Sequence, residues 1–157
     1  MDFTRPLQSG EEDAIDTLLR AAFGGPAEAQ LVRKLRKAKV MAGEMVLPFE
    51  GEIAGYYALS YLVKPKGWLA LAPVAIAPAF QRQKMGKRMI GMLSEWARIS
   101  GTPVVVLGAP DFYEKAGFRR DRAAKLTQPC PDEVTMIAGV THAHAKTLVY
   151  PRAFNAT

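Results

Sequence analysis

The sequence predicts a mixed α/β fold, with α and β layers and a central sheet flanked by helices. Two observations predict it. Residues 68–107 follow the order strand, loop, helix, strand, which builds a parallel pair of strands. Two amphipathic helix patterns and a hairpin pattern precede that unit. The 157 residues are 49% hydrophobic and 23% charged, which is typical of one globular domain spanning residues 1–157.

The N-terminal part predicts a short strand and two helices. Residues 3–8 suit the strand, and Ser9 or Gly10 could cap a helix over Glu11–Phe23. A Gly-Gly-Pro sequence ends that helix, and a second helix runs to about Lys39. The expected buried faces are Ile15, Leu18, Leu19 and Ala22 in the first helix and Leu31, Val32, Leu35 and Ala38 in the second.

The middle of the chain predicts a hairpin followed by a buried strand. Met45–Phe49 and Ile53–Val63 form the hairpin, and a Lys-Pro-Lys-Gly turn leads into the next strand. No charge occurs from Trp68 to Phe80, which suits a strand that is buried on both faces. Pro78 stops this strand, because proline cannot donate to a ladder.

A helix follows from Gly86, and Gly101 ends it. The next strand is Val104–Leu107, and the final two strands are expected at Lys125–Thr127 and at about Ala145–Tyr150. The helix face expected to be buried consists of Met89, Ile90, Leu93, Trp96 and Ala97.

The loop before this helix carries a cluster of cations, namely Arg82, Lys84, Lys87 and Arg88. Cations at a helix N-terminus are unfavourable against the helix dipole. Positive charge is reasonable there if an anion binds between the cations and the helix. The cluster therefore indicates a phosphate-bearing cofactor.

Three motifs resemble those of the GNAT superfamily of acetyl-coenzyme A-dependent N-acetyltransferases. Gln81–Gly86 is similar to the family's acetyl-CoA motif Q/R-x-x-G-x-G/A, and Val74–Pro78 is similar to the V-x-V-x-P sequence before it. Tyr113–Phe118 matches Y-x-x-x-G-F. Glu28–Arg36 and Leu148–Phe154 resemble a bacterial branch of predicted N-acetyltransferases, so the likeness spans nearly the whole chain.

The resemblance implies a GNAT acyl-CoA N-acyltransferase fold with the element order β-α-α-β-β-β-α-β-α-β-β. The central sheet would be mixed and partly splayed, with its parallel pair in the middle. The backbone before the loop would hold the pantetheine arm, the loop would bind the pyrophosphate, and Tyr113 would be the general acid. The implied cofactor-binding residues are Val74, Ala75, Ile76, Gln81, Arg82, Gln83, Lys84, Met85, Gly86 and Lys87.

Lys84 departs from the family pattern, because it replaces the first glycine of the motif. If its φ is negative, the lysine presents its N–H normally, and its ammonium can contact a phosphate. If the loop requires a positive φ, a residue other than glycine is strained there.

The implied activity is transfer of an acetyl group from acetyl-CoA to a primary amine of a small molecule or peptide, directly within a ternary complex. The alternative is a non-catalytic acyl-CoA-binding or regulatory domain. A basic nucleic-acid-binding module ranks below both, because its basic runs lack interleaved aromatic residues. The sequence does not identify the acceptor or the general base. Glu50, Glu52, Asp111, Glu114 and a water chain are the alternatives for the base.

Composition also bears on the location of the protein and on its possible partners. The net charge is +6, and no apolar run approaches the roughly 20 residues that span a bilayer. Cys130 is the only cysteine, and the N-terminus lacks a signal sequence, so we expect a cytoplasmic protein. His142 and His144 lack a third ligand, so we expect no metal. We expect no nucleic-acid or membrane partner, and the resemblance is compatible with a homodimer.

Overall fold

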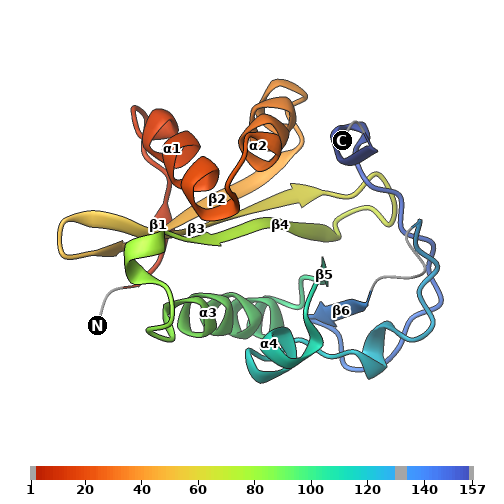
Figure 1. Cartoon of the computed structure of the whole chain (residues 1–157). Helices are drawn as coiled ribbons and strands as arrows, with labels where there is room; N and C mark the ends of the chain where they lie inside the picture. Colours follow the sequence, from red (N-terminus) through yellow and green to blue (C-terminus); the bar gives the residue numbers. More distant parts are fainter. Residues whose placement is uncertain (1–2, 130–133, 156–157) are drawn as a thin grey trace.

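A six-stranded sheet with the order β1-β2-β3-β4-β5-β6 forms the centre of the protein (Figure 1). The computed structural model describes residues 3–129 and 134–155. The strands are β1 (Arg5–Pro6), β2 (Met41–Phe49), β3 (Glu52–Tyr61), β4 (Leu69–Ile76), β5 (Val104–Leu107) and β6 (Thr135–Ala138). Only β4 and β5 are parallel, and the other neighbours are antiparallel. The predicted mixed sheet with an internal parallel pair is confirmed.

Helices α1 (Glu12–Phe23) and α2 (Ala27–Lys37) cover one face of the sheet (Figure 1). Their apolar residues pack against β2 and β3 in one buried cluster. A polar network also ties α2 to the sheet, because Glu44 accepts hydrogen bonds from the Arg36 guanidinium at 2.7 Å and from the Tyr56 hydroxyl at 2.6 Å.

Helix α3 (Met85–Ser100) and the short helix α4 (Pro110–Lys115) cover the opposite face (Figure 1). Met89, Ile90 and Leu93 are buried against the sheet, as their spacing predicts. Gly101 ends α3 in the left-handed conformation, with φ 68° and its N–H bonded to the Ala97 carbonyl. Within the described residues, no helix combines the length and apolarity needed to cross a membrane.

Three predictions about the helices are wrong. Trp96 is 46% exposed, and Ala38 lies in solvent beyond the end of α2. Both residues lie at the edge of the apolar face of their helix, where the helical repeat of apolar residues does not distinguish buried from exposed positions. Neither Ser9 nor Gly10 caps α1. Glu11 occupies the cap position, and its carboxylate pairs with Arg5 at 2.8 Å.

The two predicted final strands are also wrong, so the element order contains one strand fewer than expected. Lys125–Thr127 and Ala145–Tyr150 form only isolated bridges, between Thr127 and Thr147 and between Lys64 and Val149. The sixth strand is instead β6, which pairs with all four residues of β5. This segment forms the strand because its apolar residues Met136, Ile137 and Ala138 are buried in the core when they pair with β5.

Three tyrosines make the stability of this fold sensitive to alkaline pH. Burial raises the pKa of Tyr57 to about 12, and it also raises the pKa values of Tyr56 and Tyr113. An unfolded tyrosine titrates near pH 10. Because the folded pKa values are higher, this contribution to stability is fully present below pH 10 and is lost as the pH rises through the folded values.

We expect Tyr57 alone to lower the free energy of unfolding at pH 11 by about 1 kcal/mol relative to pH 8. Urea unfolding at both pH values measures this loss. Tyr57→Phe should reduce the loss, whereas the control Tyr61→Phe, at a half-exposed position, should not. An equal loss in the wild type and in Tyr57→Phe would contradict the assignment.

Candidate active site

The parallel strands β4 and β5 separate soon after they meet. Their pairing is limited to Leu69 with Val104 and Ala70 with Val105, although β4 continues to Ile76. A register shift in the pairing of β3 with β4 places one extra residue in β4, at Ala72-Pro73. This bulge lies just beyond Ala70, the last residue of β4 that pairs with β5. Such a bulge bends its strand. The predicted partly splayed sheet is therefore present, and it leaves one edge of β4 open.

The backbone beyond the bulge presents polar groups to this open edge. The Ala77 N–H donates to the Ala54 carbonyl of β3 at 2.8 Å. By the two-residue alternation of an antiparallel ladder, the backbone of Ala75 also faces β3, and the backbones of Val74 and Ile76 face away from it. The Ile76 carbonyl accepts a hydrogen bond from the Gln81 side chain at 3.0 Å, so Gln81 braces the turn that follows β4.

The loop after β4 has the backbone conformation of an anion-binding nest. A 3₁₀ turn at Pro78–Phe80 leads into it, and then Arg82 and Lys84 adopt positive φ values of 65° and 61°. Alternating conformations of this kind point successive N–H groups to one side. Among the described residues, none accepts a hydrogen bond from the N–H groups of residues 82–87. The first turn of α3 thus extends the row of free donors.

Positive charge surrounds these donors. Arg82, Lys84 and Lys87 are exposed, Arg88 is partly exposed, and no described acid forms an ion pair with any of the four. The first turn of α3 contains no acidic residue. Free N–H groups, a helix N-terminus and unpaired cations together suit a phosphate or pyrophosphate group.

The conformation of Lys84 settles the alternative that the sequence left open. With φ 61° and ψ 16°, Lys84 adopts the left-handed conformation that the motif glycine would adopt without strain. The interpretation in which Lys84 keeps a negative φ is therefore wrong. Its side chain is exposed and belongs to the cationic cluster.

Gly86 keeps the helix start close to its neighbours. A Cβ atom at this position would lie 3.3 Å from Cζ of Phe112 and 3.5 Å from Cγ1 of Ile76. A larger side chain would thus displace the aromatic ring or the helix start. Met85, the preceding residue, is buried in the core and anchors the loop.

Tyr113 lies on α4, just beyond the carboxyl end of β5. Its ring packs edge-on against Phe112 at 4.9 Å and against Phe118 at 5.9 Å. In the described part of the chain, no group forms a hydrogen bond with its hydroxyl. Burial raises its pKa, so the phenol keeps its proton at neutral pH.

Sequence reasoning missed Gly108, which positions the Tyr113 ring. A Cβ atom at Gly108 would lie 2.5 Å from Cε2 of Tyr113, a distance that real Cβ atoms do not reach. The ring can therefore lie against the end of β5 only because residue 108 is glycine. A glycine directly after a buried strand was the available signal.

A cavity of about 290 Å³ opens where β4 and β5 separate. Leu71 and Ala72 of β4 and Val106 and Leu107 of β5 line it, together with residues near the C-terminus. The latter are Tyr150, Phe154 and Asn155, which the sequence did not assign to a site. Tyr113 is not among the lining residues, although it packs against the residue that follows Leu107.

The alternatives for the general base lie in two places. Glu50 and Glu52 are exposed at the tip of the β2–β3 hairpin, and Asp111 and Glu114 are exposed on α4 beside Tyr113. None of the four lines the cavity between β4 and β5 in the described part of the chain.

The described residues contain no group of three or more His, Cys, Asp and Glu side chains that could hold a metal ion. His142 and His144 lie next to each other in a loop, with ring centroids 4.2 Å apart. Cys130, interpreted as an ordinary free thiol, lies outside the described residues.

Comparisons with known proteins agree with this geometry. The model of the acetyltransferase (GNAT) family matches residues 13–118. YhbS, an uncharacterized N-acetyltransferase of Escherichia coli K12, is 33% identical over 110 residues, which are 66% of this chain and 65% of YhbS. The match therefore spans slightly less than two thirds of that relative.

Two solved structures share nearly the whole fold. The crystal structure of E. coli YhbS in complex with CoA has a TM-score of 0.82 and 25% identity, over 98% of this chain and 92% of that chain. A GNAT family acetyltransferase from Brucella melitensis, solved with acetyl-CoA, has a TM-score of 0.79 and 24% identity, over 98% of both chains. The family model, the sequence relative and the shared fold agree, and the chain belongs to the GNAT acetyltransferase family.

Proposed function

We propose that this protein transfers the acetyl group of acetyl-CoA to a primary amine of a small molecule or peptide, within a ternary complex. The observation that carries this proposal is the row of free N–H groups from Arg82 to Lys87, which lies next to the open edge of β4. The CoA-bound relative of the same fold supports acetyl-CoA as the ligand.

In this proposal, two parts of the backbone bind two parts of acetyl-CoA. The loop and the start of α3 hold the pyrophosphate, with Lys84 and Lys87 adding charge-assisted contacts. Val74 and Ile76 hold the pantetheine arm through their outward-facing backbone groups, and one of their N–H groups polarises the thioester carbonyl. Ala75, whose backbone faces β3, contributes its small buried side chain to the packing beneath this strand.

The chemistry requires a neutral amine and a proton for the departing thiolate. The amine attacks the thioester carbon, the carbon–sulfur bond breaks, and the Tyr113 hydroxyl gives its proton to the CoA sulfur. The amine's own excess proton passes to water or to one of the acidic residues on α4, and solvent returns a proton to the Tyr113 phenolate. The cavity between β4 and β5 has room for the acceptor, and its aromatic wall favours an amine with an apolar body.

A non-catalytic acyl-CoA-binding or regulatory domain is the second candidate function. One observation favours it, namely that no acidic side chain lines the cavity in the described part of the chain. A panel of primary amines incubated with acetyl-CoA distinguishes the two. An acetylated product and stoichiometric release of CoA support the enzyme, whereas binding without turnover of any amine supports the second candidate.

Composition supports three further parts of the proposal. We infer one acetyltransferase domain over residues 1–157, a cytoplasmic location, and no nucleic-acid or membrane partner. The salt dependence of nucleic-acid binding tests the last point, because counterion release would give a steep slope. We expect little affinity for duplex or single-stranded nucleic acid at physiological salt.

Lys84→Gly should raise the stability of the protein and lower its affinity for acetyl-CoA. Removing a side chain from the left-handed conformation should raise the free energy of unfolding by up to about 1 kcal/mol, less the entropy that glycine adds to the unfolded chain. The loss of the ammonium should weaken acetyl-CoA binding by about 1.5–3 kcal/mol. Denaturant unfolding and calorimetry measure the two effects. Tighter binding by the variant would contradict the phosphate contact and favour the non-catalytic candidate.

A further inference from the structure

A serine of α3 bonds this helix to the end of α4, the short helix that carries Tyr113 and lies beside α3 (Figure 1). The Ser94 hydroxyl lies 2.6 Å from the Ala116 carbonyl and 3.1 Å from the Gly91 carbonyl of its own helix. A serine hydroxyl has one proton, so it donates to the nearer Ala116 carbonyl. In the described part of the chain, no backbone N–H donates to this carbonyl. Ser94 thus supplies a partner to a carbonyl at a helix end, where the helix itself has none.

Gly117 allows Ser94 to come this close to the end of α4. Its φ is 108°, and a Cβ atom here would overlap the Ser94 oxygen and lie 3.0 Å from the Ser94 Cβ atom. A side chain therefore does not fit between α3 and this turn. Gly117 is the glycine of the Y-x-x-x-G-F motif, and the contact with Ser94 gives that glycine a physical reason.

The turn that Ser94 bonds also holds the Tyr113 ring. The N–H groups of Ala116 and Phe118 both donate to the Tyr113 carbonyl, at 3.1 Å and 3.0 Å. The buried Phe118 ring packs edge-on against the Tyr113 ring. Because no described group forms a hydrogen bond with the Tyr113 hydroxyl, its place depends on these contacts of the ring and the turn.

Helix α4 is too short to fix its own position. It has six residues, and isolated helices of fewer than about 12 residues are only marginally stable in water. Its start is held at the end of β5, where the Tyr113 ring lies against Gly108. Its end is held by the hydrogen bond from Ser94. Loss of that bond would leave α4 fixed at one end only.

We propose that Ser94 is a positioning residue for acetyl transfer, because its bond to the Ala116 carbonyl fixes the end of α4 and thereby the place of the Tyr113 hydroxyl. This inference rests on the proposed function, in which Tyr113 is the general acid. Ser94 touches no reacting group and acts through Tyr113. A catalytic group displaced by about 1 Å can lose roughly 100-fold in rate, so the effect of such a residue is measurable.

A double-mutant cycle with Ser94→Ala and Tyr113→Phe tests this role. Ser94→Ala should lower kcat about tenfold, and no more than Tyr113→Phe does, with an unchanged KM for acetyl-CoA. In the Tyr113→Phe background, Ser94→Ala should have no further effect, because the hydroxyl that it positions is already absent. A residue that only stabilises the fold would lower the rate by the same factor in both backgrounds.

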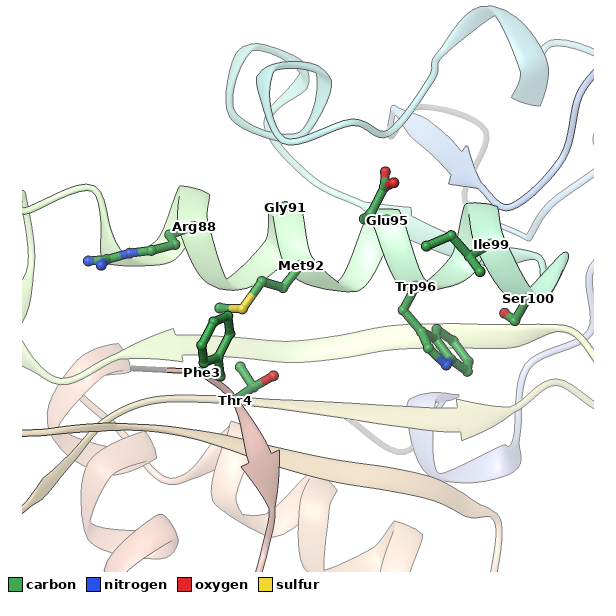
Figure 2. Close-up of a pocket in the computed structure, with 9 residues that line it drawn as sticks. All are labelled: Phe3, Thr4, Arg88, Gly91, Met92, Glu95, Trp96, Ile99 and Ser100. Atoms are coloured by element: carbon green, nitrogen blue, oxygen red, sulfur yellow. The ribbon is translucent and has the colours of Figure 1, made fainter. Parts of the chain in front are cut away.

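Ser100→Ala is the matched control for Ser94→Ala. It also removes a hydroxyl from α3, where Ser100 bonds the Thr102 hydroxyl at 3.0 Å. Ser100 borders an outer cavity at the C-terminal end of the helix, together with Trp96 and Ile99 (Figure 2). No described residue of α4 borders this cavity, so Ser100→Ala should leave kcat unchanged. Circular dichroism of each variant verifies the fold.

Titration of the Tyr113 phenol tests the positioning without turnover. Burial raises the pKa of Tyr113 in the wild type. In Ser94→Ala, a loosened α4 should expose the ring, so this pKa should fall toward the ordinary value near 10. NMR of ¹³C-labelled tyrosine measures it, and the signal missing from Tyr113→Phe identifies the residue.

Three results would overturn the proposal, namely a normal kcat of Ser94→Ala, equal rate losses in both backgrounds, and an unchanged pKa of Tyr113 in Ser94→Ala. A wild type that acetylates no amine would instead contradict the proposed function. The titration would then still decide whether Ser94 positions Tyr113.

Discussion

Replacement of Tyr113 by phenylalanine is expected to lower the rate constant of acetyl transfer by roughly 10- to 1000-fold, which overlaps the roughly 100- to 10,000-fold that a positioned general acid typically contributes. The variant keeps the ring and its packing against Phe112 and Phe118 but loses the proton that the proposed mechanism transfers to the thiolate. The affinity for acetyl-CoA should change little. Turnover with an amine accepted in the screen, measured where chemistry limits the rate, gives the first quantity, and calorimetry gives the second.

Two controls sharpen this test. An acyl donor with a more acidic thiol should reduce the difference between the wild type and the variant, because its thiolate needs less protonation. Gly108→Ala should also lower the rate while leaving the hydroxyl in place, since its Cβ overlaps the Tyr113 ring. Normal turnover by Tyr113→Phe would remove this residue from the mechanism and leave solvent or another side chain as the acid.

Gly86→Val should weaken acetyl-CoA binding about 10- to 100-fold, corresponding to the 1–3 kcal/mol that overpacking costs. Its Cβ would come within 3.3 Å of Phe112, and its methyl groups would push the start of α3 out of line with the nest. Calorimetric titration with acetyl-CoA measures the loss.

Gly43→Val is the matched control for Gly86→Val. Gly43 lies in β2, where a Cβ atom meets nothing within 4 Å, so the same substitution should leave the affinity unchanged. Equal affinity of the wild type and Gly86→Val would contradict the placement of the pyrophosphate at this loop.

The periodic part of the fold could be predicted from the sequence. α3 and β5 were expected near their observed bounds, because a sixteen-residue amphipathic pattern and a β-branched run leave little ambiguity. β6 could not be separated from its neighbours. Lys125–Thr127 and Thr135–Ala138 are both short, and only the pairing with β5 and the burial of Met136 and Ile137 choose between them.

The candidate site was predictable where a motif specifies backbone conformation. The motif pointed to the loop before α3, but the positive φ of Lys84 required the structure, because lysine seldom adopts that conformation. The sequence did not predict the roles of Gly108 or of the aromatic side chains Tyr150 and Phe154 that line the cavity, and the reason is different. Their roles depend on contacts between segments that lie far apart in the chain.

Backbone amide NMR during titration with acetyl-CoA tests the proposed binding site directly, because that site consists of particular N–H groups. We expect the largest chemical-shift changes at the N–H groups of residues 82–87 and at those of Val74 and Ile76. The hairpin tip at Glu50–Glu52 and the outer residues of α2 should change little. Saturating acetyl-CoA that leaves the amides of residues 82–87 unshifted would contradict the proposed site.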